Sequence, residues 1–342
     1  MPEAATTAGV VDAHHHLYST LARGMPAPPR PPRTFPEILE LVWWRLDRAL
    51  DLDLVRWSTL LGAVEALEAG TTAVVDHHSS PNAIEGSLDV IADACTEVGL
   101  RVRCCYEVTD RNGPDGAKAG LAENERFLRD GGQGYVGAHA CSTLSDDTLD
   151  AICGTADDLG VGVHIHVAED VSDGAAGERL AERARDDWLL AHAVHLDRPL
   201  KGTIAHNPRS NLNNGVGYGR PARWDRVALG TDGIGSDMQA EASLAFALQR
   251  ADDVTATPVD AWSWLAAGAS LVPEVAGDVV TWSYEPMDPW QLAYTSGVRP
   301  LRVDVDGECV LDEHGPTRVD AVEVRANARE QALRLFARLA TT

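Results

Sequence analysis

Four groups of polar residues, each placed directly after a short β-like run, could bind a divalent metal ion. His14 and His16 end the first run, and His166, His192 and Asp232 end three later runs. Because side chains two residues apart on a strand point the same way, His14 and His16 can bind one ion together. Three histidines and an aspartate accept Zn²⁺, Fe²⁺ or Mn²⁺. We predict one ion, Zn²⁺ first, held by His14, His16, His166 and Asp232 of a hydrolytic enzyme.

Three side chains in these groups are suited to move protons or stabilise charge. Glu169 follows His166 by three residues, so its carboxylate can reach the water at the metal without binding the ion, as a proton shuttle requires. Asp232 is also a candidate base for that water, although an Asp between Thr and Gly can instead cap a helix or form a turn. His192 is the third catalytic candidate. His164 shares a strand face with His166 and is interpreted as a hydrogen-bonded core histidine.

Aromatic and imidazole side chains near these groups are candidates for contact with a substrate. Trp43, Trp44 and Tyr18 could stack on a planar ring, since aromatic faces pack on one another, or they could be part of the core. His139 follows the fourth β-like run, and His78 follows the second. We expect His139, Trp43, Tyr18 and His78 to line the substrate site.

The elements that must position these residues form a regular alternation of short apolar runs and helical patterns. Eight such strands with intervening helices predict an α/β fold, a (β/α)8 TIM barrel, whose functional residues lie at the carboxyl ends of the strands. The predicted strands are Val10–Ala13, Thr72–Asp76, Arg101–Val108, Gly134–Gly137, Val161–Val167, Trp188–Ala193, Gly202–Ala205 and Arg226–Gly230. Helical patterns cover Arg56–Ala69, Glu85–Val98, Gly116–Arg129 and Ser145–Leu159.

Two regions depart from the plain repeat. A proline-rich stretch leads into an aromatic helix predicted over Phe35–Leu54, which could be a lid over the site, internal packing or a dimer contact. The runs after Pro273 predict a small β unit, followed by a final helix over Val319–Leu339. We therefore expect a barrel over residues 1–272, a small, incomplete β unit over 273–318, and a helix within 319–342 that packs on the barrel.

Composition narrows the partners and the compartment. The net charge of −23 over 342 residues argues against nucleic acid and anionic membranes as partners, because both repel an acidic surface. A small molecule is the expected substrate. The six cysteines contain no Cys-x-x-Cys pair, and reduced thiols are typical of cytosolic proteins. No signal peptide is recognisable, so a cytoplasmic protein is expected.

Several segments together resemble the amidohydrolase superfamily, in particular its aminohydrolase branch of cytosine, guanine and triazine deaminases and chlorohydrolases. Within that branch they are similar to the SsnA-type aminohydrolases. The segments that carry the resemblance are Asp12-Ala13-His14-His15-His16-Leu17-Tyr18-Ser19, Trp43-Trp44-Arg45-Leu46-Asp47, Gly137-Ala138-His139-Ala140 and Gly230-Thr231-Asp232-Gly233-Ile234-Gly235-Ser236-Asp237-Met238. The resemblance implies that His14, His16, His166 and Asp232 bind the metal and that Glu169 and His192 lie at the reacting group.

The same resemblance bears on metal number, assembly and the chain start. Dinuclear relatives bridge two metals with a modified lysine after the fourth strand, but Lys118 and Lys201, the only lysines, are not placed to do so, so one metal is expected. The superfamily makes a homodimer plausible. Relatives usually carry a β segment before the first histidine strand, whereas only nine residues precede Val10 here, so the C-terminal β unit is expected to lack partners.

The leading functional hypothesis is hydrolytic deamination of an aminated heterocycle or an amidine-like small molecule. In this reaction Asp232 takes a proton from the attacking water, Glu169 protonates a ring nitrogen, and His192 stabilises charge on the reacting group. The same site could instead hydrolyse a cyclic amide or a carbon–halogen bond. An alternative of a different class is a barrel that binds metal without catalysis.

Overall fold

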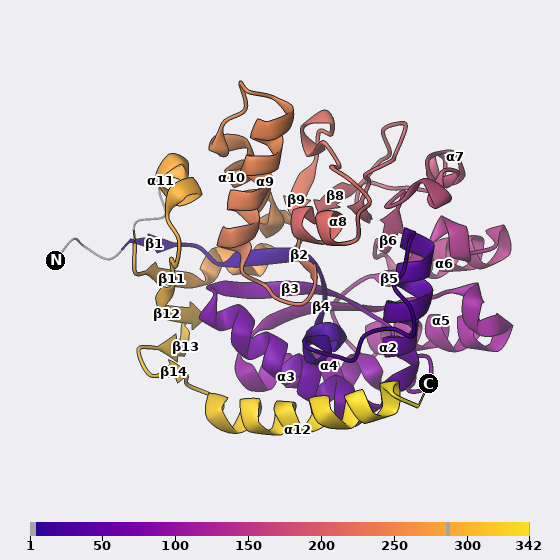
Figure 1. Cartoon of the computed structure of the whole chain (residues 1–342), viewed down its shortest axis with the longest axis horizontal. Helices are drawn as coiled ribbons and strands as arrows, with labels where there is room; N and C mark the ends of the chain where they lie inside the picture. The colour runs from indigo at the N-terminus through magenta and orange to yellow at the C-terminus, as the bar shows by residue number, and fades with distance from the viewer. Residues whose placement is uncertain (1–4, 285–287, 342) are drawn as a thin grey trace.

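The computed structural model describes residues 5–284 and 288–341, and within them eight parallel strands form a barrel (Figure 1). All eight strands predicted from the sequence are present. Main-chain bridges at Cys104–Gly134 and Val108–Ala138 join β4 to β5. The bond from Thr231 N to His14 O then closes the ring. The barrel strands are β2 (Val10–His16), β3 (Thr71–His78), β4 (Arg101–Tyr106), β5 (Val136–Ala140), β6 (Val163–Val167), β7 (Leu189–His192), β8 (Thr203–His206) and β9 (Val227–Leu229), and the short β10 (Asp232–Gly233) pairs with β2.

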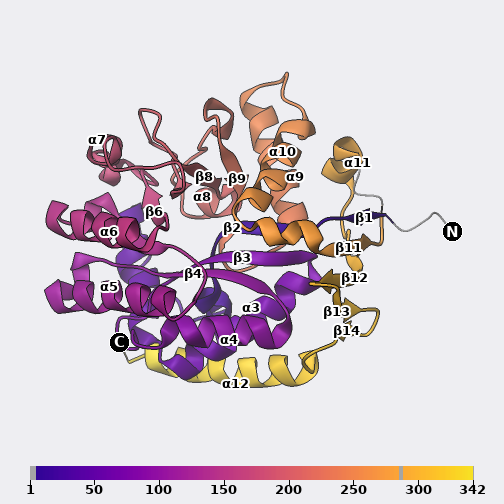
Figure 2. The same ribbon diagram turned by 180° about the vertical axis from the view of Figure 1, so that it is seen from behind.

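Helices cover the outside of the barrel, as Figures 1 and 2 show from opposite sides. Local signals set their ends: the Ser145 hydroxyl accepts a bond from Thr148 N at the start of α6, and Gly99 ends α4 with a φ of 93°. Lys118 lies on α5, and like Lys201 it is exposed. The larger helices are α3 (Leu52–Glu68), α4 (Ser87–Val98), α5 (Gly113–Arg129), α6 (Asp146–Leu159), α7 (Ala176–Leu180), α8 (Pro208–Asn213), α9 (Met238–Asp252), α10 (Pro258–Ala267), α11 (Pro289–Tyr294) and α12 (Ala321–Leu339).

The aromatic segment after β2 is not the single helix predicted over Phe35–Leu54. It contains α1 (Phe35–Ile38), a π-helical turn (Leu39–Trp43) and α2 (Trp44–Ala49), and the helix ends at Ala49. Asp51 caps the next helix by accepting a bond from Leu54 N at 2.9 Å, which requires extended backbone at that point. The cap therefore interrupts the helix, although the apolar spacing continues across it.

A small antiparallel sheet lies beside the barrel and includes the start of the chain (Figure 1). Its order is β1 (Thr6–Thr7), β11 (Val279–Trp282), β12 (Pro300–Val305), β13 (Glu308–Asp312) and β14 (Gly315–Pro316). Thr6 pairs with Thr281, and Trp282 Nε1 donates to Thr7 Oγ1 at 2.9 Å. The expectation that this unit lacks an N-terminal partner is wrong, because two residues before β2 are enough to pair with β11.

The last helix, α12, packs along α3, with Val324 and Leu335 buried in the shared core (Figures 1 and 2). Arg334 adds ion pairs to the Asp51 and Asp53 carboxylates at the start of α3. Among the described residues, no helix has both the length and the apolar character needed to cross a bilayer. The barrel is thus supported on one side by a helix from the far end of the chain.

Candidate metal centre and active site

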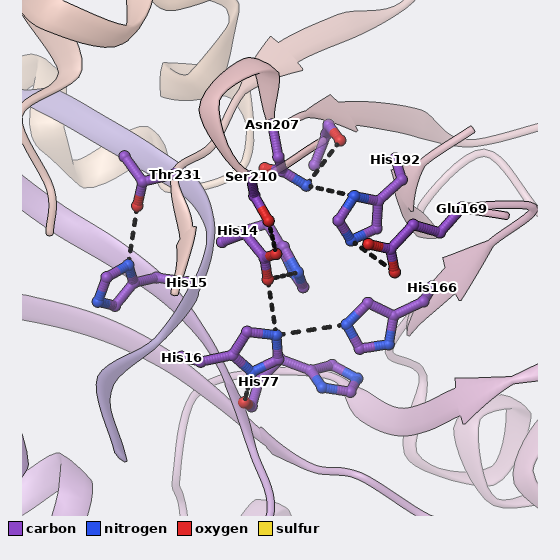
Figure 3. A network of polar contacts seen from close by, with 12 residues as sticks. His14, His15, His16, His77, His166, Glu169, His192, Asn207, Ser210 and Thr231 are labelled. Carbon is purple, nitrogen blue, oxygen red and sulfur yellow. Dashed lines mark hydrogen bonds and ion pairs between the residues drawn. The ribbon is translucent and has the colours of Figure 1, made fainter. Parts of the chain in front are cut away.

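Five side chains from three barrel strands and the β9–β10 turn meet at the carboxyl end of the barrel. Figure 3 shows His14, His16, His166 and His192 arranged around one region. His16 Nε2 lies 2.9 Å from Asp232 Oδ1, His14 Nε2 lies 3.3 Å from the same oxygen, and His166 Nε2 lies 3.3 Å from His16 Nε2. The structure therefore brings together all four residues predicted as ligands.

The orientation of the imidazoles fits a divalent cation. Each of the three predicted histidine ligands turns Nε2 inward and uses Nδ1 for a contact on the outside. His16 Nδ1 contacts His77 O at 2.5 Å, and His166 Nδ1 contacts His139 O at 2.9 Å. His14 Nε2 is buried and has no hydrogen-bond partner among the described residues. A buried nitrogen lone pair beside a carboxylate is what a cation would bind, and His14, His166, His192 and Asp232 could also group around one ion.

Glu169 and His192 lie beside this cluster and face each other. Glu169 Oε2 is 3.6 Å from His192 Nε2, and Asn214 Nδ2 donates to Glu169 Oε1 at 3.2 Å. Burial raises the pKa of Glu169 to about 7, although His192 opposes the shift. A carboxyl group with a pKa near 7 can both release and accept a proton at neutral pH, as a shuttle must.

Two residues that support the site, Ser210 and Asn211, follow the seventh predicted strand, where the sequence favours loop support over a place in the pocket. Asn211 Oδ1 contacts His192 Nδ1 at 2.8 Å, and Ser210 Oγ donates a short bond to Asp232 Oδ2. Both residues lie on α8, directly after β8, at the carboxyl end of the barrel. That position is the signal that could have identified them.

A turn with left-handed backbone places Asp232. This residue has a φ of 63°, and its neighbour Thr231 is fixed by Asp12, whose Oδ1 accepts from Thr231 N at 3.0 Å. His15 points away from the cluster, and its Nδ1 contacts Thr231 Oγ1 at 2.8 Å. Gly230 allows the turn to approach β2, since a Cβ there would lie 2.8 Å from His14 N.

The cluster opens into a cavity of about 320 Å³ at the carboxyl end of the barrel. Trp43, Tyr18 and His139, all predicted substrate contacts, line this cavity. His78 does not: its side chain is buried, and its Nε2 contacts Ser80 Oγ at 2.8 Å. His78 is therefore not a proposed substrate contact. It is the last residue of β3, and its side chain is directed away from the cavity.

A buried charged group in the cavity wall was also missed. Arg111 Nη2 donates to Asp47 Oδ2 and to Glu107 Oε1, both at 2.8 Å, and its guanidinium lies 4.7 Å from the centre of the Trp44 ring. Burial raises the pKa of Glu107 to about 7, although Arg111 opposes the shift. Glu107 directly follows β4, and this position was the available signal. The wall thus offers charge and aromatic surface beside the histidines, since Glu107 Oε2 lies 3.6 Å from His77 Nδ1.

Two deaminases are similar in sequence to most of this chain. The chain is 29% identical to 5-methylthioadenosine/S-adenosylhomocysteine deaminase of Desulfitobacterium hafniense, over 97% of this chain and 86% of that protein. It is 31% identical to the 5'-deoxyadenosine deaminase of Methanopyrus kandleri over 71% of this chain and 61% of that protein.

Solved structures agree on the fold. An adenosine deaminase from Xanthomonas campestris with bound zinc superposes with a TM-score of 0.81 at 24% identity, covering 98% of this chain and 87% of that one. The zinc complex of the atrazine chlorohydrolase from Arthrobacter aurescens superposes with a TM-score of 0.79 at 19% identity, covering 96% and 88%. The model of the amidohydrolase family matches residues 5–270. This chain has a closed barrel with histidines at the ends of its strands and Asp232 after the last one, and it belongs to the amidohydrolase family.

Proposed function

We propose that this protein is a metal-dependent hydrolase that removes an amino group from a heterocycle. The observation that carries the proposal is the meeting of His14, His16, His166 and Asp232 at the closed end of a cavity, with Glu169 alongside. These four residues would hold one divalent ion, Zn²⁺ first. Such an ion supplies a water whose pKa falls from ~15.7 towards ~7, which makes hydroxide available at neutral pH.

The protein groups around the ion have distinct roles in this proposal. A carboxylate oxygen of Asp232 accepts a proton from the attacking water, and Ser210 holds the other oxygen in place. The Glu169 carboxyl delivers a proton to a ring nitrogen, which lets the adjacent carbon accept the nucleophile. His192 stabilises negative charge on the reacting group. Asp232 passes the proton that it took from water to the amino group, the hydroxyl proton on the tetrahedral carbon returns to Glu169, and ammonia leaves as the carbon–nitrogen bond breaks. The cavity walls position the ring during these transfers.

The substrate proposed first is an adenine nucleoside. Three observations support it: the similar curated proteins act on 5-methylthioadenosine, S-adenosylhomocysteine and 5'-deoxyadenosine, the cavity is of nucleoside size, and Trp43 and Trp44 line it. Indole faces bind planar bases by stacking. Adenine also has the amino-bearing carbon beside a ring nitrogen that the proposed roles of Glu169 and Asp232 require.

Ammonia release from a substrate panel tests the proposal. The metal-loaded protein is assayed with adenosine, 5'-deoxyadenosine, 5'-methylthioadenosine, aminated pyrimidines, guanidines, a cyclic amide and a chlorotriazine. We expect ammonia from at least one aminated ring, and none after removal of the metal with a chelator. Ring opening or halide release without ammonia would favour the amide or halogen alternative. A fully metallated protein that hydrolyses no member of the panel would favour the non-catalytic barrel.

Compartment and assembly are proposed from the cysteines and from exposed aromatic side chains. All six cysteines are free thiols, which is typical of a reducing compartment, and we propose the cytoplasm. We also propose a homodimer, since Trp290 and Tyr294 of α11 expose 45% and 77% of their surface beside the small sheet. Light scattering of the purified protein tests the dimer, and a monomer at micromolar concentration would contradict it.

A further inference from the structure

Of the three predicted histidine ligands, one is held by a side chain, and the other two contact main-chain carbonyl oxygens. His14 Nδ1 lies 2.7 Å from His164 Nε2, and both residues are buried. The outer nitrogens of His16 and His166 instead contact main-chain carbonyl oxygens. A carbonyl group is present whatever the side chain is, so among the three histidine ligands only the orientation of His14 depends on the identity of another residue.

The proton positions along this contact follow from simple valence. A neutral imidazole has one N–H donor and one acceptor nitrogen. If His14 presents the Nε2 lone pair to a cation, its proton is on Nδ1 and is donated to His164 Nε2. His164 must then carry its own proton on Nδ1. Each nitrogen of the two rings is thereby assigned a single role.

A third buried residue, Cys105, accepts a hydrogen bond from the remaining N–H group of His164. His164 Nδ1 lies 3.6 Å from Cys105 Sγ, and the same sulfur lies 3.6 Å from Asp76 O. The Cys105 S–H can donate to that carbonyl group while a sulfur lone pair accepts from His164. Burial raises the pKa of the Cys105 thiol, which keeps the thiol protonated. All donors in the series from Asp76 O to His14 are therefore satisfied in one arrangement.

We propose that His164 is a positioning residue that, together with Cys105, fixes the tautomer and ring orientation of His14 for metal binding. The inference rests on the proposed metal site but goes beyond it, because it assigns a role to two residues outside the ligand set. Contacts of this kind, in which a second group holds a ligating histidine, typically change metal affinity by about 10–100-fold.

Packing alone is a poorer account of a histidine at this position. His164 lies among other rings, with centroids 4.7 Å from His77 and 5.7 Å from Tyr135, where an apolar side chain would avoid the cost of burying polar nitrogens. A structural role would require only that the side chain fill the space. A positioning role requires in addition an acceptor at the place of Nε2 and a donor near Cys105.

Two amide variants separate these roles. In His164→Gln the amide oxygen can reach the place of Nε2 and accept from His14, whereas the shorter side chain in His164→Asn reaches only the place of Nδ1. We measure Zn²⁺ affinity by competition with a chelating dye and kcat at saturating metal. His164→Asn and His164→Ala should bind Zn²⁺ about 10–100-fold more weakly than the wild type, and His164→Gln within about 3-fold of it. His78→Gln, a buried histidine on β3 that contacts Ser80, should leave the affinity unchanged.

The outcomes distinguish this inference from the proposed function. A wild type that binds no Zn²⁺ would overturn the metal site itself, whereas absence of deamination would leave the affinity comparison intact. Equal affinity in the wild type, His164→Ala and His164→Asn would overturn the inference alone, and so would a loss of affinity in His164→Gln equal to that in His164→Ala. If the His164 variants fail to fold, as judged by circular dichroism, Cys105→Val and Cys105→Ser take their place. Only the valine should weaken Zn²⁺ binding, because serine keeps an acceptor; equal affinity in both would overturn the inference.

Discussion

At the scale of single residues, the site includes two glutamates, Glu169 and Glu107, whose pKa values burial raises to about 7. Glu169 is the clearest case, since it faces His192 at 3.6 Å and does not belong to the group of predicted ligands. No group of described residues that could hold a metal ion includes Glu169, and its raised pKa favours proton transfer over metal binding. One substitution that removes the transferable proton of Glu169 but keeps the shape of its side chain separates proton transfer from metal binding.

Glu169→Gln should keep its metal but lose most turnover. The amide fills the same space and cannot transfer a proton, so kcat should fall by about 10²–10⁴-fold while the Zn²⁺ content stays near one ion per chain. Metal analysis and the ammonia assay measure the two quantities. Glu182→Gln, an exposed residue in the segment after α7, is the matched control and should be as active as the wild type. Full activity in Glu169→Gln would remove Glu169 from the chemistry.

The raised pKa of the buried Glu241 carboxyl group leads to a prediction of how the free energy of unfolding changes with pH. Burial raises its pKa from 4.5 to about 7, even though Arg209 Nε donates to it at 2.6 Å. Because the folded pKa is above the unfolded one, the folded protein holds this proton more tightly. This contribution is fully present below pH 4.5 and is lost as the pH rises through about 7, amounting to at most about 3 kcal/mol.

The expected result is that Glu241→Gln becomes more stable relative to the wild type as the pH rises. The neutral amide has no proton to lose, so the difference in unfolding free energy between the two proteins should grow in its favour between about pH 4.5 and about pH 7. Urea unfolding at several pH values measures it. Parallel pH profiles for the two proteins would contradict the raised pKa.

At the scale of elements, the β9–β10 turn is the part whose conformation decides where a ligand lies. Asp232 has left-handed backbone, which costs energy for a residue other than glycine. The Thr231 hydroxyl, which contacts His15 and donates to Asp12, holds the turn in that state. The turn and β2 thus depend on each other, although more than 200 residues separate them in the chain.

Thr231→Val should weaken metal binding without loss of the barrel. Valine has the shape of threonine but lacks the hydroxyl that contacts Asp12 and His15, so Asp232 is held less firmly and Zn²⁺ affinity should fall by about 10-fold or more. The dye competition assay measures the affinity, and circular dichroism reports the fold. Thr59→Val is the control, because the Thr59 hydroxyl on α3 is buried and has no hydrogen-bond partner among the described residues. An unchanged affinity in Thr231→Val would show that the turn holds itself.

At the scale of the whole molecule, the excess of acidic residues is the dominant property. A net charge of −23 on a folded chain repels itself, and at low ionic strength this repulsion acts across the molecule. Many arginines lie in exposed ion pairs, such as Arg185 with Asp157, which contribute little individually. Screening of the net charge should therefore outweigh the loss of these pairs.

Added salt should raise the melting temperature of the metal-loaded protein. Between about 0.02 M and about 0.3 M NaCl the Debye length falls from about 20 Å to about 6 Å, which removes most long-range repulsion but keeps contact pairs. A thermal melt followed by circular dichroism measures the change, and KCl at equal ionic strength should act alike. A melting temperature that falls with salt would show that the ion pairs matter more than the net charge.

Particular residues show which features of the fold and of the site can be predicted from the sequence. The eight barrel strands follow from short apolar runs, and His14 and His16 share a side of β2 because strand side chains alternate. These are local properties, and the chain displays them directly. The break at Asp51 shows the limit of periodicity, since a capping side chain ended a helix whose apolar spacing continued.

Only the tertiary structure decided which residues far apart in the chain contact one another. The pairing of β1 with β11, the Asp47–Arg111 ion pair and the His14–His164 contact each join segments that no local pattern connects. The sequence alone therefore determined which residue types stand at the strand ends, and with them the chemistry to expect. The closed barrel decided which nitrogen faces inward and what holds it there, because those depend on the packing of side chains that meet only after the ring has closed.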